Sequence, residues 1–275
     1  MKISVFQMCS GIDPQANATA LVAAIAEAAI GGAKMLFTPE MSGLLDRDRL
    51  RAAEKLSNEA TDFVLSSVRT AAAFHNIWVA LGSLALSGER DDGRLVNRSL
   101  IIDGSGEVRA RYDKLHLFDV DLVSGETWRE SSAYAPGDGA VVVQTPVGRL
   151  GLSVCYDLRF PALYSTQSGA GAELLAVPAA FTVPTGKAHW HVLMRARAIE
   201  NAAWVIAAAQ CGSHEDGRET FGHSLVIDPW GTVVLEMSDG VGLGFADIDL
   251  AAVFDARRRI PVLDHRRAIP QIRNV

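Results

Sequence analysis

Three side chains with complementary chemistry stand at the ends of short apolar runs in this sequence. They are Glu40 in LFTPEMSG, Lys114 in RYDKLHLF and Cys155 in GLSVCYDLRFP. A carboxylate can accept the proton of a thiol, a thiolate can attack an acyl carbon, and an ammonium can stabilise the resulting oxyanion. The combination predicts nucleophilic catalysis by a cysteine on an acyl substrate.

Each of these residues also has an ordinary interpretation. A lone cysteine after an apolar strand is more often buried filler than a nucleophile. A glutamate after proline is usually a solvated loop charge, and Lys114 could pair with Asp113 or Asp119 at the surface. Sites in layered α/β proteins gather where strands end and loops begin, so the shared position at strand ends favours a common site.

The elements that must position these groups follow from apolar periodicity and turn signals. Strands are predicted at Lys2–Cys9, Lys34–Thr38, Trp78–Leu84, Leu95–Asp103, Glu107–Asp113, Val141–Gln144, Arg149–Val154, Glu173–Val177, Trp204–Gln210, His223–Ile227, Val233–Glu236 and Leu243–Asp247. Helices are predicted at Asn17–Ile30, Glu59–His75, Pro161–Gly171 and Lys187–Ala203. Because hairpins and helix-linked crossovers mix, we expect two mixed sheets packed face to face with helices outside.

Composition limits the classes of protein. The 275 residues show no linker or repeat, so one domain over 1–275 is expected. The formal net charge of −6 argues against a nucleic-acid partner. No apolar run is long enough to span a membrane, and the opening MKISVFQMCS does not resemble a secretory signal. Three cysteines outside any CxxC pair predict reduced thiols and a cytoplasmic location.

The chain resembles the nitrilase (carbon–nitrogen hydrolase) superfamily over nearly its whole length. The resemblance lies in FTPEMSG, RYDKLHLF and GLSVCYDLRFP, followed by TGKAHWHVLMRARAIEN and GHSLVIDPWG in the same order. It implies an α/β fold, a four-layer αββα sandwich with two mixed β-sheets. It also implies a catalytic triad of Glu40, Lys114 and Cys155, with Glu130 in TWRESSAYAPG as a second glutamate beside the thiol.

The resemblance further implies a mechanism that needs neither a metal nor an organic cofactor. Glu40 would act as base, Cys155 as nucleophile, and Lys114 with the backbone N–H of Tyr156 would stabilise the oxyanion. Arg159 is a candidate ligand for a substrate carboxylate, although it could instead form a salt bridge with Asp157 that shapes the loop.

Within the superfamily, the motifs are most similar to the amidase branch that includes deaminated glutathione amidase and omega-amidase. The expected reaction is hydrolysis of a small primary amide of the deaminated glutathione or 2-oxo acid ω-amide type, through a thioester and with release of ammonia. The alternatives are an N-carbamoyl amino acid hydrolase or a nitrilase that uses the same triad. A non-catalytic scaffold protein is a further alternative, which the intact triad disfavours.

Several other residues call for structural interpretations. His116 is expected to hold a loop by a hydrogen bond, and Cys211 to be inert. His189 and His191 flank Trp190 without metal-ligand partners at a fitting spacing. The C-terminal segment, about 249–275, is irregular, and we expect it to pack at the interface of a homodimer or higher oligomer; the alternative is a frayed basic tail.

Overall fold

Two mixed six-stranded sheets form the centre of the protein, whose computed structural model describes residues 1–121, 125 and 127–269. The first sheet has the order β16-β1-β2-β3-β4-β5, with β1 Lys2–Gln7, β2 Met35–Phe37, β3 Trp78–Leu86, β4 Val96–Ile102, β5 Val108–Asp113 and β16 Gly242–Asp247. The second has the order β15-β14-β11-β10-β9-β8, with β8 Val142–Thr145, β9 Gly148–Leu152, β10 Leu174–Ala176, β11 Trp204–Ala207, β14 Leu225–Ile227 and β15 Val233–Glu236. Two small hairpins pair β6 Asp119–Asp121 with β7 Thr127–Arg129, and β12 Cys211–Ser213 with β13 Glu219–Phe221.

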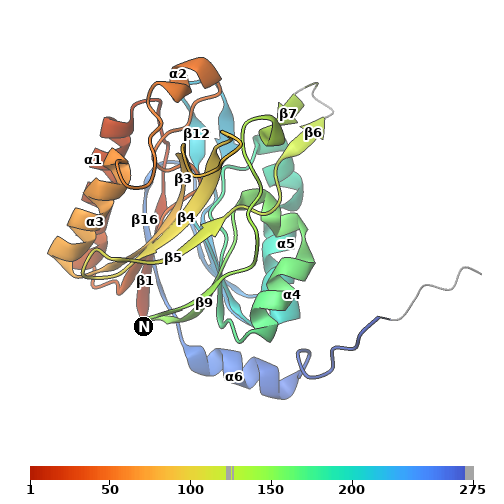
Figure 1. Cartoon of the computed structure of the whole chain (residues 1–275). Helices are drawn as coiled ribbons and strands as arrows, with labels where there is room; N and C mark the ends of the chain where they lie inside the picture. Colours follow the sequence, from red (N-terminus) through yellow and green to blue (C-terminus); the bar gives the residue numbers. More distant parts are fainter. Residues whose placement is uncertain (122–124, 126, 270–275) are drawn as a thin grey trace, which may run out of the picture.

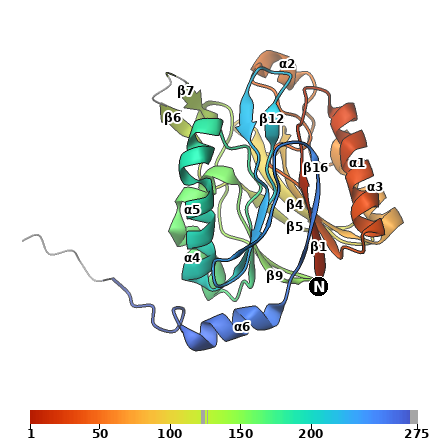
Figure 2. The ribbon, with the colours of Figure 1, turned by 180° about the vertical axis from the view of Figure 1, so that it is seen from behind.

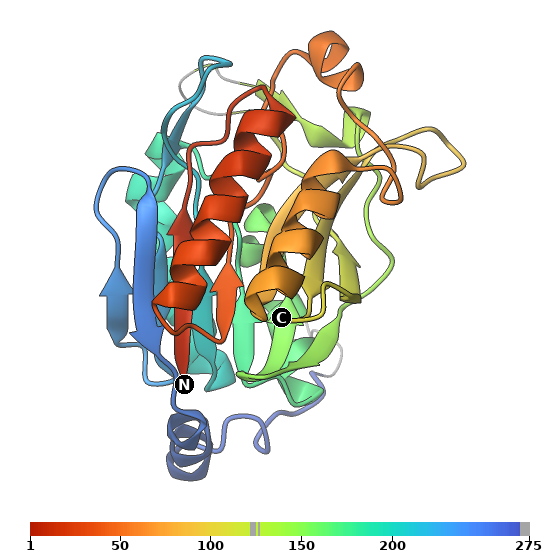
Figure 3. The ribbon, with the colours of Figure 1, turned by 90° about the vertical axis from the view of Figure 1, so that its left-hand side faces the viewer.

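Helices cover the outer faces of both sheets. α1 (Pro14–Ile30) and α3 (Phe63–His75) lie on the first sheet, and α4 (Pro161–Gly169) and α5 (Val183–Asn201) lie on the second, as Figures 1 and 2 show from opposite sides. Figure 3 shows α1 and α3 side by side on their sheet. The predicted αββα sandwich is confirmed.

The two faces of the first sheet bury different side chains, because successive residues of a strand point to opposite faces. Ile3 and Val5 of β1 belong to the core that also contains Leu150 and Leu152 of β9, and this core therefore lies between the sheets. In the second cluster, Phe6, Leu36 and Leu81 pack with apolar residues of α1 and α3. The alternation of the strands thus builds both the centre and one outer layer.

The helices begin at capping residues rather than where the apolar period suggested. α1 starts at Pro14 instead of Asn17, because the Asp13 side chain accepts a hydrogen bond from the Gln15 backbone. α3 starts at Phe63 instead of Glu59, because Asp62 caps it. α5 runs from Val183 to Asn201 instead of Lys187–Ala203; its first turn contains Pro184, and Ala202 adopts a left-handed conformation. The predicted α4 ends two residues early, at Gly169.

Short elements were missed in regions that read as loops or as an irregular tail. They are α2 (Arg49–Ala53), the two small hairpins and α6 (Leu250–Arg259). α6 packs on its own chain through Val253 and Ala256, and Arg257 donates to the backbone oxygens of Ala172 and Ala202. Residues 270–275 of the predicted interface segment lie outside the described part of the chain. Among the described residues, no helix is both long and apolar enough to cross a membrane.

Candidate active site

One cavity of about 600 Å³ brings together the residues predicted to do chemistry. Its lining includes the six predicted site residues, Glu40, Lys114, Glu130, Cys155, Tyr156 and Arg159. These come from the loop after β2, the end of β5, the segment after β7 and the segment after β9. The end-of-strand positions seen in the sequence therefore meet in space.

Lys114 is the electrostatic centre of this cavity. Its Nζ lies 2.9 Å from Glu40 Oε1, and 2.9 and 3.1 Å from the two carboxylate oxygens of Glu130, while its side chain is only 2% exposed. Burial alone would lower the pKa of Lys114, but the carboxylates of Glu130 and Glu40 outweigh it and hold this pKa well above its usual value. The ammonium therefore keeps its charge.

Asn97 is a site residue that sequence reasoning missed. It lies on β4, fully buried, and its amide donates to Glu40 Oε1 at 3.0 Å and to Glu130 Oε1 at 3.2 Å. Its backbone oxygen also accepts a hydrogen bond from Lys114 N. The only signal in the sequence was a polar residue inside the strand VNRSLII, since a buried amide needs hydrogen-bond partners.

The carboxylate of Glu40 is fixed from several directions. Ala180 N donates to Glu40 Oε2 at 3.0 Å, and Gln210 Nε2 donates to the Glu40 backbone oxygen at 2.9 Å. The preceding loop presses against β3 at Gly82, where a Cβ atom would lie 2.1 Å from the Thr38 backbone oxygen. Glycine is therefore required at position 82 for the loop to deliver Glu40 to the cavity.

Cys155 begins a short 3₁₀ helix, Cys155–Arg159, directly after β9. Its φ of 49° lies in the left-handed region, which is costly for a residue with a Cβ atom, and its N–H donates to the Pro178 backbone oxygen at 2.8 Å. Burial and the Glu40 carboxylate raise the pKa of the Cys155 thiol well above its usual value, and Lys114 opposes them only in part. The resting sulfur therefore carries its proton.

The predicted salt bridge between Asp157 and Arg159 is wrong. The fully buried Asp157 carboxylate instead accepts hydrogen bonds from the Tyr112 hydroxyl at 2.7 Å, from Val154 N at 2.8 Å and from His116 N at 3.0 Å. His116 Nδ1 also lies 2.7 Å from Asp157 Oδ1, so the structural role predicted for this histidine is confirmed. Asp157 thus joins the segment after β5, which carries Lys114, to the turn that carries Cys155.

Alkaline pH is expected to destabilise the fold through these buried groups. Burial, followed by the Asp157 carboxylate, raises the pKa of Tyr112, and burial raises that of Cys155; their unfolded-state values are near 10.0 and 9.0. Because the folded state then binds more protons than the unfolded state, the free energy of unfolding should fall above about pH 9, by about 1.4 kcal/mol per pH unit for each group that has titrated. Lys114 acts in the same direction.

The measurement is urea unfolding between about pH 8 and about pH 11, on the protein and on Tyr112→Phe. This variant should be less stable throughout because it loses the bond to Asp157, but its decline above about pH 10 should be shallower by about one proton. An identical slope in both proteins would show that Tyr112 does not carry the effect.

The rim of the cavity is aromatic and cationic. The Arg159 guanidinium carbon lies 5.9 Å from the Tyr156 ring centroid and 5.6 Å from that of Phe181, and its nitrogens lie 3.4 Å from His189 Nδ1. Arg218 lies over Trp128 at 5.2 Å. Arg218 and Trp128 were not singled out from the sequence; both reach the cavity from the small hairpins that the apolar pattern did not reveal.

The sequence model of the carbon–nitrogen hydrolase family matches residues 2–258. The chain therefore belongs to the carbon–nitrogen hydrolase family, and the predicted superfamily and the predicted hydrolase of carbon–nitrogen bonds are confirmed.

Relatives with names of their own cover most of the chain. The deaminated glutathione amidase of Yersinia enterocolitica is 37% identical over 98% of this chain and 94% of its own length. The human deaminated glutathione amidase is 40% identical over 96% of this chain and 82% of its own length. The crystal structure of the Caenorhabditis elegans NitFhit protein superposes with a TM-score of 0.89 and 41% identity; the match covers 97% of this chain and 65% of that one.

Proposed function

We propose that this protein is a cysteine amidase that hydrolyses the amide of a 2-oxo acid, with deaminated glutathione as its substrate. The observation that carries the proposal is the buried Lys114 ammonium, held between Glu40 and Glu130 in the cavity that Cys155 also lines. Relatives at about 40% identity carry the name deaminated glutathione amidase. An amidase from Nesterenkonia, 28% identical with a TM-score of 0.78, undergoes Michael addition of acrylamide at its active site cysteine.

The first half of the reaction begins with proton transfer from Cys155 to Glu40, a step that contributes about 10² to 10⁴ in rate. Because the pKa of the thiol is raised, this transfer accompanies attack on the substrate rather than preceding it. A bond forms between sulfur and the carbonyl carbon, and the carbonyl electron pair moves to oxygen. Lys114 and the backbone N–H of Tyr156 stabilise this oxyanion, and a single donor of this kind is worth about 10² to 10³.

The second half releases the two products. The carbon–nitrogen bond breaks, the leaving amine takes the proton from Glu40, and a thioester remains on Cys155. Water then loses a proton to Glu40, attacks the thioester carbon and restores the thiol, leaving a carboxylate. Glu130 positions the reactants through Lys114 and Asn97. Every group comes from the protein, so this sequence of steps uses no metal or organic cofactor.

The leaving group depends on the amide. The amide bonds of glutathione are secondary, so the deaminated tripeptide releases a peptide amine, whereas a primary ω-amide of a 2-oxo acid releases ammonia. An assay of this protein therefore has to follow both products.

Arg159 is proposed to bind a carboxylate of the substrate. Its planar guanidinium suits bidentate pairing with a carboxylate, and within the described part of the chain no acidic side chain forms a salt bridge with it. The stacked positions over Tyr156 and Phe181 hold this fork at the cavity. A 2-oxo acid carries the required carboxylate next to its ketone.

The proposal is tested by measuring kcat/KM for deaminated glutathione, 2-oxo ω-amides, N-carbamoyl amino acids, nitriles and an uncharged short amide. Deaminated glutathione should be preferred, and Arg159→Ala should lower kcat/KM for it by about 10- to 100-fold, the equivalent of one charge-assisted pair. The uncharged amide is the internal control, because it has no carboxylate to lose. Preference for a carbamoyl compound or a nitrile would assign the competing hydrolase activity, and hydrolysis of none of the compounds would favour a scaffold protein.

We also propose a homodimer in the cytoplasm. Phe254 and Ile260, on and just after α6, are exposed apolar side chains, and all three cysteines are free, as expected for a reducing compartment. Light scattering should give twice the chain mass of 29.4 kDa, and Phe254→Glu should reduce it to one chain mass. Phe74→Glu, on the exposed side of α3, is the matched control. A single-chain mass for the unaltered protein would contradict the dimer.

A further inference from the structure

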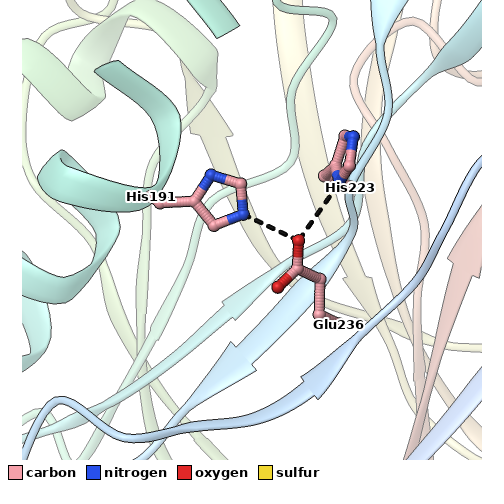
Figure 4. Close-up of side chains that lie close together, drawn as sticks. All are labelled: His191, His223 and Glu236. Carbon is pink, nitrogen blue, oxygen red and sulfur yellow. Dashed lines mark hydrogen bonds and ion pairs between the residues drawn. The ribbon is translucent and has the colours of Figure 1, made fainter. Parts of the chain in front are cut away.

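A second cluster of polar side chains lies outside the catalytic cavity. It consists of His191 on α5, Glu236 on β15 and His223 in the segment before β14, drawn in Figure 4. His191 Nε2 lies 2.8 Å from Glu236 Oε1, and His223 Nδ1 lies 3.1 Å from the same oxygen. One donor atom from each residue lies within 4.8 Å of the others. Two imidazoles therefore converge on one carboxylate.

The surrounding structure holds these side chains in place. The Phe221 ring stacks on His223 at 4.4 Å and 26°, and its edge meets His191 at 6.2 Å. His223 has a φ of 55°, and Trp190 Nε1 donates to the His223 backbone oxygen at 2.8 Å. A left-handed conformation at a residue with a side chain is costly, and it persists only where neighbours enforce it. The donor set is thus preorganised by rigid elements.

The cluster is accessible from solvent. The side chains of His191, His223 and Glu236 are 36%, 29% and 41% exposed, so an ion could enter while the imidazoles stay partly covered. The sequence does not reveal the set, because His191 and Glu236 are 45 residues apart and come together only through the packing of α5 on the second sheet.

We propose that His191, His223 and Glu236 bind a Zn²⁺ ion. Two imidazole nitrogens and one carboxylate oxygen are a set that zinc accepts in tetrahedral sites, and water would complete the fourth position. Without the ion, the ionised carboxylate can only accept hydrogen bonds, so His191 Nε2 and His223 Nδ1 carry the protons. On binding, each proton moves to the other nitrogen of its ring, and the rings stay neutral.

The ion would brace one wall of the catalytic cavity. Thr185 of α5 and Thr220 of β13 line that cavity, and the zinc would link α5 to β15 and to the segment that follows β13. Its role is structural, because the proposed hydrolysis makes no use of it. Zinc binding and amidase activity can therefore fail independently.

The test is equilibrium dialysis of the full chain against Zn²⁺, followed by competition with a chromophoric chelator. The protein should retain one equivalent, and zinc should raise its melting temperature. His191→Ala and the nearly isosteric Glu236→Gln should each weaken binding by more than the roughly 10- to 100-fold expected for loss of an outer-shell partner. His265→Ala, which removes an exposed histidine elsewhere, should bind zinc as the unaltered protein does.

The catalytic thiol is the competing ligand, and two measurements exclude it. Cys155→Ala should retain the equivalent of zinc, and Co²⁺ in place of zinc should show no thiolate charge-transfer band. Failure of the unaltered protein to retain zinc would overturn the proposal. So would full retention by both His191→Ala and Glu236→Gln, or loss of zinc in Cys155→Ala together with a thiolate band.

Discussion

Replacing Cys155 with alanine should abolish amide hydrolysis, with kcat falling by roughly 10⁴- to 10⁶-fold, as when the nucleophile of a catalytic triad is removed. The reason is that the thioester cannot form without the sulfur, and the remaining groups can only bind and polarise the substrate. The substitution removes one small atom from the edge of the cavity, so the free energy of unfolding should change little. Steady-state kinetics and urea unfolding measure the two effects separately.

Cys211→Ala is the matched control for this experiment. Cys211 is also buried, and burial raises the pKa of its thiol to about 11, but its side chain does not line the catalytic cavity. Its removal should leave kcat unchanged. Mass spectrometry adds a direct observation: acrylamide should modify Cys155 and spare Cys211. Full activity of Cys155→Ala would remove the nucleophile from the mechanism.

Replacing Lys114 with methionine should damage both activity and stability. The variant leaves the Glu40 and Glu130 carboxylates in a buried site without their cation, and removal of one partner of a buried ion pair costs about 3 to 5 kcal/mol. Loss of the oxyanion donor should lower kcat by a further 10² to 10³ or so. Lys34→Met, at an exposed position, is the control for the loss of a lysine charge.

A double-mutant cycle with Glu130→Gln shows whether the pair itself carries the stability. With Lys114 replaced, one carboxylate is an uncompensated charge, so Glu130→Gln should cost less in the Lys114→Met background than alone, or should stabilise it. Urea unfolding of the four proteins gives the coupling free energy. Additive effects of the two substitutions would contradict direct pairing of Lys114 and Glu130.

The chemistry of the site was largely readable from the sequence. Glu40, Lys114 and Cys155 stand at the ends of apolar runs, and the two-residue period of a strand, with Pro39 or a polar segment after it, marks such ends locally. The layered architecture followed from the order of strands and helices for the same reason. What stayed open was whether these ends would meet.

Partners in the network around the site were not readable, because they lie far apart along the chain. Asn97 and Glu40 are 57 residues apart, and they meet only because the loop after β2 crosses β3 at Gly82. Asp157 was paired with its near neighbour Arg159, yet its carboxylate faces Tyr112, 45 residues away. Proximity in sequence is a poor guide for a buried carboxylate, which takes whichever donors the fold delivers.

The sequence by itself determined the reactive groups, most strands and the αββα layering, because side-chain type and apolar periodicity act over a few neighbouring residues. Helix ends depended on capping residues such as Asp13 and Asp62, whose local signals compete with that periodicity. Only the tertiary structure decided which carboxylates surround Lys114 and that His191, His223 and Glu236 converge. Those contacts arise from strand order and from the packing of helices on sheets, which no local pattern encodes.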